Sequence, residues 1–366
     1  MRIAIATVQV PFITGGAEIL CDLLKNELIK RGHKVEVVTI PFKWYPTEQL
    51  VNSMLMGRMI DLSESDGQKI DRVIALKFPA FYCKHPNKVL WLLHQHRQAY
   101  DLWDTPYGNL QNQPNGTVIR DMIRDCDNKY LPEAKKIFTI AKTTTNRLKE
   151  YNNIEAKTLY HPPGNYEKLH LEDFGDYVFY PSRIDAIKRQ RLLVEAAKYF
   201  KTDAKVIIAG SGNKDEIDYI NTFIKDNNLE NRVTMAGFIS EEEKIKYYAN
   251  CLAVYFGTYN EDYGYITLEG FFSEKPVIVH KDAGGPLEFV EDNVSGYVID
   301  SDAKKLAEKI DYLYEHKDEA KRMGANGKKS LKDKNMDWDY VIDQLLSCEG
   351  ENNGQIHDVI CQSFSS

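Results

Sequence analysis

Short apolar runs alternate with amphipathic stretches along most of the chain. Residues 2–9 form a mostly apolar run, and residues 17–30 then carry apolar side chains at the spacing of one helical face, namely Ile19, Leu20, Leu23, Leu24 and Leu28. Arg31-Gly32-His33 ends this predicted helix, and residues 34–40 predict the next strand. Further strands are predicted at residues 72–77, 88–94, 135–141 and 156–160.

The same alternation restarts after residues 161–176, where His161-Pro162-Pro163-Gly164 and a polar stretch are typical of a linker. Strands are then predicted at residues 177–180, 205–209, 232–236, 252–256 and 276–280. Helices are predicted near residues 188–200, 214–226, 241–250 and 265–273, with closing helices at 304–315 and 339–346. Apolar strands separated by helices predict parallel sheets covered on both faces. The expected fold is α/β, with two Rossmann-like doubly wound domains facing across a cleft.

The length of 366 residues fits this division into two domains. We place an N-terminal domain at residues 1–165 and a second domain at residues 176–335. Residues 336–366 are expected to form a C-terminal helix that packs back on the N-terminal domain, followed by a loose tail.

The composition is that of a globular protein and argues against membrane-spanning and disulfide-rich classes. Hydrophobic content of 43% and charged content of 28% are those of a globular protein. No apolar run approaches the roughly 18 residues of a membrane span, and no signal-peptide pattern follows Met1, so we expect a cytoplasmic, water-soluble protein. The six cysteines include no CxxC pair, which argues against a zinc site and a disulfide framework.

Charge is distributed unevenly along the chain. Residues 1–160 hold 22 Lys and Arg against 17 Asp and Glu, a balance of +5, and residues 161–366 hold 25 against 37, a balance of −12. Such an acidic protein is not expected to bind nucleic acid. The mildly basic first half is compatible with peripheral contact at the inner face of a membrane through the N-terminal domain, and ordinary solvated surface is the alternative reading.

Two carboxylates flank a predicted helix start. Glu261 falls on a loop and Glu269 about five residues into the helix, because residues eight apart on one helix would be roughly 80° off a common face. Between them, free N–H groups of Tyr265, Ile266 and Thr267 are expected to face a diphosphate. One carboxylate could then accept hydrogen bonds from ribose and the other from a sugar. Solvated loop and helix charges are the alternative interpretation of the pair taken alone.

Two cations follow the first strand of the second unit. Arg183 and Lys188 lie five residues apart at a strand's carboxyl end, where the cleft is expected. Fixed cations at that edge can neutralise a leaving diphosphate without a metal. Arginine offers phosphate a bidentate fork, and lysine offers a point charge. Surface charges at a helix start are the alternative.

Together these residues resemble a retaining glycosyltransferase of family four (glycosyl transferases group 1), which has the two-domain GT-B fold. The similar pieces cover most of residues 1–300, and their order and spacing carry the resemblance. They are Gly15-Gly16-Ala17-Glu18, Arg31-Gly32-His33-Lys34-Val35, Ser182-Arg183 with Lys188, Ala209-Gly210-Ser211-Gly212, Val233 to Phe238, Glu261 with Glu269, and Gly284-Gly285-Pro286-Leu287-Glu288.

The resemblance implies a role for each matching position. Arg183 and Lys188 would bind the donor diphosphate, and Gly16 would let a loop of the acceptor-side first domain approach it. Glu269 would hold the ribose, Glu261 the transferred sugar, and the loop at Gly237-Phe238 would lie near the base. Gly210 would also belong to the donor-binding set. His94, at the end of the strand 88–94, matches a sugar-contacting histidine, with His96 as its competitor.

Two departures from the family pattern stand out. Asp262 occupies a position where glycine is usual, so the backbone path there is not given by the resemblance. The segment 94–129, with Arg97, Tyr100, Trp103 and Tyr107, has no family-wide counterpart. An insertion that binds an acceptor and simple hydrophobic loop packing explain its aromatic content equally well.

We therefore expect a metal-independent retaining glycosyltransferase of surface polysaccharide or glycolipid synthesis, with a UDP-sugar or GDP-sugar donor, a saccharide or lipid-linked acceptor and no cofactor. The alternatives are a GT-B nucleotide-sugar epimerase and a non-catalytic sugar-nucleotide-binding subunit. A dinucleotide fingerprint fails, because Asp215 stands where Gly210-Ser211-Gly212 would need its third glycine. We recognise no carboxylate pair positioned for a metal.

Overall fold

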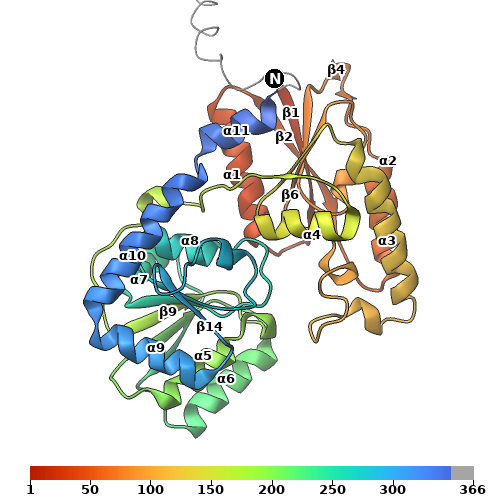
Figure 1. The fold of residues 1–366 in the computed structure, drawn as a ribbon. Coiled ribbons are helices and arrows are strands. Elements are labelled where there is room, and N and C mark those ends of the chain that lie inside the picture. Colours follow the sequence, from red (N-terminus) through yellow and green to blue (C-terminus); the bar gives the residue numbers. More distant parts are fainter. Residues whose placement is uncertain (348–366) are drawn as a thin grey trace, which may run out of the picture.

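Two six-stranded sheets organise residues 1–347, which are the residues that the computed structural model describes. Each sheet forms the centre of one lobe in Figure 1, the first lobe drawn in red to yellow and the second in green to blue. All strand pairs in both sheets are parallel. The predicted fold of two doubly wound α/β units is confirmed. The predicted loose tail lies outside the described residues from 348 onward.

The first sheet has the strand order β2-β1-β5-β6-β7-β8. Its strands are β1 Arg2–Gln9, β2 Lys34–Pro41, β5 Arg72–Ala75, β6 Lys88–Leu92, β7 Lys136–Thr139 and β8 Lys157–Thr158. Its helices are α1 Gly16–Lys30, α2 Glu48–Met59, α3 Gly116–Tyr130 and α4 Lys142–Asn152, and a small hairpin joins β3 Glu64–Ser65 to β4 Gln68–Lys69. In α1, Leu20, Leu24 and Leu28 are fully buried because residues four apart share one helical face.

The second sheet has the order β11-β10-β9-β12-β13-β14. Its strands are β9 Tyr177–Pro181, β10 Lys205–Ala209, β11 Val233–Gly237, β12 Ala253–Phe256, β13 Val277–His280 and β14 Gly296–Ile299. Its helices are α5 Gln190–Ala196, α6 Lys214–Asp226, α7 Glu241–Asn250, α8 Tyr265–Phe272, α9 Ala303–Glu315 and α10 Lys317–Leu331. All of β12 and β13 is buried, as expected for central strands of a parallel sheet.

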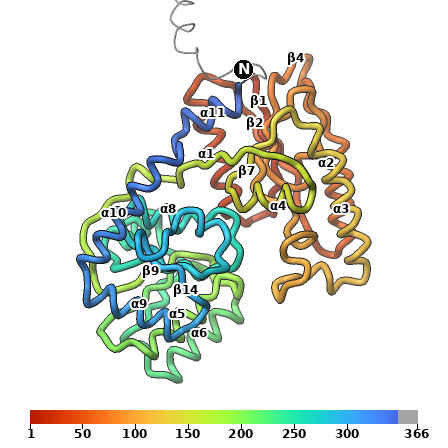
Figure 2. Tube along the Cα trace, viewed as in Figure 1, coloured from red at the N-terminus to blue at the C-terminus, as the bar shows by residue number. Residues whose placement is uncertain are grey.

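The last described helix, α11 Trp338–Leu346, returns to the first lobe (Figures 1 and 2). The rings of Trp338 and Trp91 meet edge to face at 6.2 Å. Arg72 Nη1 donates to the carbonyl of Leu345 at 2.7 Å, and Lys157 Nζ donates to Gln344 at 2.7 Å. The chain thus crosses between the lobes twice, once before β9 and once after α10.

Two predicted boundaries that affect the site are wrong. Strand β6 ends at Leu92, so His94 lies two residues beyond the strand and not at its end. The helix predicted from residue 188 begins at Gln190, because the Asp185 side chain accepts the N–H of Ile187 at 3.2 Å and closes a short 3-10 turn over Ala186–Lys188. Arg189 then adopts a left-handed conformation, with φ of 54°. Among residues 1–347 there is no helix with the length and apolarity needed to cross a bilayer.

Candidate donor site where the two lobes meet

Glu261 lies on the loop between β12 and α8 and pairs with Lys188 from the loop after β9. Lys188 Nζ donates to Glu261 Oε2, and Thr258 Oγ1 donates to the same oxygen at 2.9 Å. Burial raises the pKa of Glu261, but the charge of Lys188 outweighs it, so the pKa lies below its ordinary value. The structure therefore brings together two of the predicted residues and keeps the Glu261 carboxylate ionised at neutral pH.

The backbone of the Glu261 loop lies against a pair of glycines. Glu261 N–H donates to Ala283 O at 2.7 Å, and Gly285 N–H donates to Glu261 O at 2.7 Å. Gly284 has φ of 77°, and a Cβ there would lie 2.6 Å from Glu261 O. Only glycine permits this approach, which explains the Gly284-Gly285 pair in the sequence.

Arg183 stands apart from that pair. Its side chain is 65% exposed, and its nearest ionic partner is Asp185 at 3.8 Å. The backbone beside it is closely packed, because Gly210 has φ of 134° and a Cβ there would lie 2.1 Å from Ser182 O. Gly210 thus shapes the Arg183 loop, while the guanidinium itself is open to an incoming anion.

Helix α8 begins after Gly264, which has φ of 91°. Within residues 1–347, the N–H groups of Tyr265 and Ile266 meet no acceptor, as predicted for a helix start. The prediction for Thr267 is wrong, because its N–H donates to Gly264 O at 3.0 Å. Because the carbonyl of the left-handed Gly264 accepts the N–H of Thr267, two free N–H donors remain at the start of α8 instead of three.

Glu269 is buried inside the second lobe and already has two donors. Lys244 Nζ donates to Oε1 at 3.0 Å, and Tyr248 hydroxyl donates to Oε2 at 2.7 Å. Both donors come from α7, one helical turn apart. A carboxylate has about four acceptor positions, so two remain besides those used by these donors. Sequence reasoning missed Lys244 and Tyr248, although their spacing of four places them on one face of a predicted helix.

Two further predicted residues have distinct surroundings. Gly16, at the start of α1, faces Tyr265 at the start of α8, since a Cβ at Gly16 would lie 3.1 Å from the Tyr265 ring. The first lobe therefore approaches the free N–H groups at the start of α8. Phe238 follows β11 and is 85% exposed.

His94 and His96 face different neighbours. Burial lowers the pKa of His94. The carboxylate of Asp262, on residues 257–264 between β12 and α8 (the donor loop), opposes that shift. His96 instead packs against Phe42 and Phe78, with ring centroids 6.3 and 5.2 Å away, and burial lowers its pKa to about 3. Of the two histidines, His94 is the one that interacts electrostatically with Asp262 of the donor loop.

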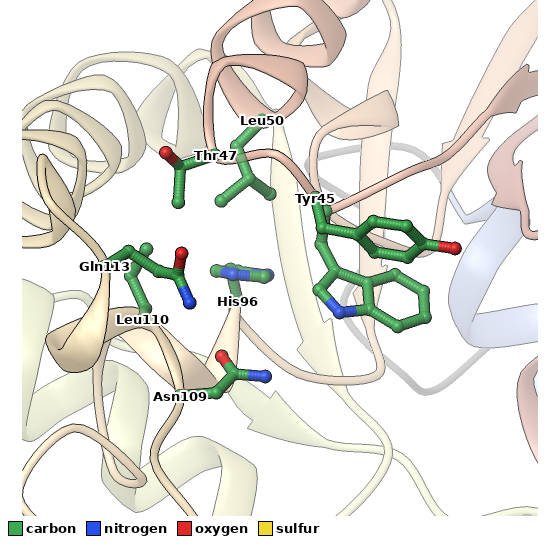
Figure 3. Close-up of a pocket in the computed structure, with 8 residues that line it drawn as sticks. Tyr45, Thr47, Leu50, His96, Asn109, Leu110 and Gln113 are labelled. Atoms are coloured by element: carbon green, nitrogen blue, oxygen red, sulfur yellow. The ribbon is translucent and has the colours of Figure 1, made fainter.

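His96 also lines a partly open pocket of about 160 Å³ in the first lobe, which Lys188 and Glu261 do not line. Figure 3 shows His96 at the centre of the labelled side chains, with Thr47 and Leu50 on one side and Asn109 on the other. The lining residues are Trp44, Tyr45, Thr47, Leu50, His96, Asn109, Leu110 and Gln113. This set combines the aromatic side chains of Trp44 and Tyr45 with two amides, two hydroxyls and a neutral imidazole, and it contains no formal charge.

A cluster that sequence reasoning did not assemble joins the lobes beside Glu261. Arg97 and Arg147 of the first lobe contact Asn260 and Asp262 of the donor loop, and Asp101 lies between the two arginines. Two features of the sequence pointed to this cluster: the unusual Asp262 and the unmatched segment that contains Arg97. Arg97 and Asp262 are 165 positions apart, however, and no local sequence pattern predicts that they meet.

The fold and these contacts define a class of protein. The two facing doubly wound lobes form a GT-B fold, and residues 166–330 match the family model of glycosyl transferases group 1. The matched residues span the second lobe and include Arg183, Lys188, Glu261 and Glu269.

Known proteins similar to this chain are glycosyltransferases. Alpha-1,3/1,6-mannosyltransferase ALG2 of Dictyostelium discoideum is 32% identical over 140 residues, which are 37% of this chain and 33% of ALG2. The chain thus aligns with about a third of the length of that relative. An uncharacterized glycosyltransferase of Methanocaldococcus jannaschii is 22% identical over 95% of this chain and 97% of its own length. The structure of Anabaena HepE in complex with UDP and glucose superposes with a TM-score of 0.68 at 16% identity, over 94% of this chain and 98% of that one.

Proposed function

We propose that the protein is a retaining glycosyltransferase that moves a sugar from a nucleotide diphosphate sugar to an acceptor hydroxyl without a metal. The acceptor oxygen forms a bond to the anomeric carbon on the face from which the nucleotide leaves. The bond from that carbon to the β-phosphate oxygen breaks, and the leaving phosphate takes the acceptor's proton. The nucleoside diphosphate then departs with the bonding electron pair.

One observation carries the proposal, which is the group of anion-binding elements around Glu261. Arg183 is open to solvent, Lys188 is held beside Glu261, and the start of α8 offers two free N–H donors. Cations and helix N-termini stabilise charge that develops on a leaving diphosphate. Lys188 has two roles in this scheme. It binds the diphosphate, and it orients the Glu261 carboxylate that contacts the transferred sugar.

The nucleotide half of the donor is placed on the second lobe. The remaining acceptor positions of Glu269 would take the ribose hydroxyls, and the exposed Phe238 would lie against the base. Gly16 lets the first lobe approach the diphosphate next to Tyr265. UDP and GDP both fit this scheme, and the UDP bound by the structurally similar HepE supports testing UDP-sugars first.

The acceptor is placed on the first lobe, as a saccharide or a lipid-linked saccharide of surface polysaccharide or glycolipid synthesis. The uncharged pocket in Figure 3 supports a neutral sugar, since aromatic rings and amides bind sugar faces and hydroxyls. His94 would contact the transferred sugar near Glu261. We keep peripheral membrane contact through the basic first half as part of the proposal.

The test is incubation with UDP- and GDP-sugars and a panel of saccharide and glycolipid acceptors, followed by NMR of the product. We expect transfer with the donor's anomeric configuration kept, and unchanged turnover after EDTA treatment. Inversion would contradict the retaining mechanism. An epimerised donor without acceptor would favour an epimerase, and donor binding without turnover would favour a non-catalytic subunit.

A further inference from the structure

Three consecutive residues of the donor loop are held from opposite sides. Asn260 and Asp262 contact arginines of the first lobe, whereas Glu261 between them contacts Lys188 of the second lobe. Neighbouring residues on one short loop are therefore tied to different lobes. The orientation of Glu261 depends on both.

The contacts to the first lobe are several and directional. Arg147 Nη2 donates to Asn260 O at 2.9 Å and to Asn260 Oδ1 at 2.7 Å, and Arg147 Nη1 pairs with Asp262 Oδ1. Arg97 Nη2 donates to the same Asn260 carbonyl at 2.7 Å, and Arg97 Nε lies 3.6 Å from Asp262. A loop held by this many planar donors has little freedom to rotate.

Asp101 completes the cluster from within the first lobe. It accepts from Arg97 Nη2 at 2.6 Å and from Asn260 Nδ2 at 3.0 Å, and it lies 3.6 Å from Arg147. Two arginines and two aspartates thus balance in charge. This balance lets the side chains stay buried, with exposed fractions of 7% for Arg147 and 6% for Asp101.

The electrostatics agree with the geometry. Burial raises the pKa of Asp262, but Arg97 and then Arg147 outweigh it, so the pKa lies well below its ordinary value. The carboxylate of Asp262 therefore stays ionised at neutral pH. Both sequence departures meet here, since Asp262 replaces the usual glycine and Arg97 belongs to the unmatched segment.

We propose that Asp262 is a positioning residue through which Arg97 and Arg147 of the first lobe set the orientation of Glu261. The inference rests on the proposed function, because Glu261 is taken there as the residue that reads the transferred sugar. Separation of the lobes would release Asn260 and Asp262 but leave Glu261 on Lys188. The Glu261 carboxylate is then correctly oriented toward the transferred sugar only while the two lobes are in contact.

The test compares Asp262→Asn and Arg147→Met with Arg58→Met in the full-length protein. Arg58 is a matched control, because it makes a bidentate pair with Glu133 at 2.7 and 2.9 Å within the first lobe alone. We expect kcat for transfer to fall roughly 10- to 100-fold in the first two variants, since misplacement of a reacting group by about 1 Å costs that much. Affinity for bare UDP or GDP should stay unchanged, because those ligands lack the sugar.

A double variant separates positioning from general destabilisation. If Arg147 acts in part through Asp262, then Arg147→Met combined with Asp262→Asn should lower kcat by less than the product of the two single losses. Additive losses, or loss of nucleotide affinity in step with kcat, would overturn the proposal. Unchanged kcat in both single variants would overturn it as well.

A measurement without substrate keeps this proposal distinct from the proposed function. Small-angle scattering of the ligand-free protein should show a larger radius of gyration in Arg97→Met/Arg147→Met than in the wild type or in Arg58→Met. Identical radii would overturn the contact between lobes on which the inference depends. A wild type that transfers no sugar but opens on loss of the two arginines would contradict the proposed function alone.

Discussion

Arg183 and Lys188 share one predicted role but have different surroundings. The Arg183 side chain is 65% exposed and stands 3.8 Å from Asp185. The Lys188 side chain is 15% exposed and neutralises Glu261. An exposed ion pair contributes little to folding, whereas removal of one partner of a buried pair leaves an unpaired charge. Replacement of Lys188 should therefore lower the stability of the fold, whereas replacement of Arg183 should not.

We predict that Arg183→Ala and Lys188→Ala each lower turnover roughly 10²- to 10³-fold, like other deletions of charge-stabilising groups. Thermal denaturation should show a lower melting temperature in Lys188→Ala and an unchanged one in Arg183→Ala. Near-normal turnover in both variants would contradict the charge-stabilising role. Equal melting temperatures would contradict a stabilising role of the partly buried Lys188–Glu261 pair.

Asp127 shows how one residue anchors an element. It lies on α3, fully buried, and accepts from the hydroxyls of Tyr82 at 2.6 Å and Tyr100 at 2.7 Å. Burial raises its pKa to about 7 despite these two donors. A raised folded pKa contributes stability that is complete below the unfolded value of about 3.9 and is lost as pH rises through about 7.

At the scale of this helix we predict a pH-dependent effect of Asp127→Asn. The free energy of unfolding of the wild type should fall between pH 5 and pH 8 relative to that of the variant. Chemical denaturation at the two pH values measures the difference. Asp121→Asn, on the same helix with a side chain 56% exposed, controls for the substitution itself. A parallel pH dependence in wild type and Asp127→Asn would contradict the prediction.

Most strands were predictable because each is a short apolar run, but β14 and the polar hairpin of β3 and β4 were not predicted. Predicted and observed bounds agree for residues 205–209 and differ by one residue for β11, β12 and β13. Amphipathic spacing likewise located α1, α6 and α7. Element ends were less predictable, because Asp185 and Gly264 close local turns that periodicity does not encode.

The candidate site was predictable only within the second lobe. Glu261 and Lys188 were predicted at the same edge because both follow strands of one sheet, but the ion pair between them was not predicted. The two donors to Glu269 and the arginines around Asp262 were missed. These contacts depend on which helix faces lie together and on how the lobes meet, which the sequence alone does not specify.

At the scale of the whole molecule, the lobes are joined at points beyond the cluster around Asp262. Glu288, from the predicted motif at residues 284–288, accepts from the N–H groups of Lys142 at 2.8 Å and Thr143 at 2.6 Å. A residue of the second lobe thus caps helix α4 of the first, where a carboxylate is favourable. Together with α11, these contacts bring the proposed acceptor and donor halves against each other.

The central claim is that the group around Glu261 binds a nucleotide diphosphate sugar. Thermal-shift measurement against UDP, GDP, ADP and their sugar conjugates, with the wild type and Arg183→Ala side by side, tests it most directly. One nucleotide at 100 times its dissociation constant should stabilise the wild type by about 2.7 kcal/mol, and Arg183→Ala should lose most of that stabilisation. No stabilisation by any of these ligands, or equal stabilisation of both proteins, would contradict the account.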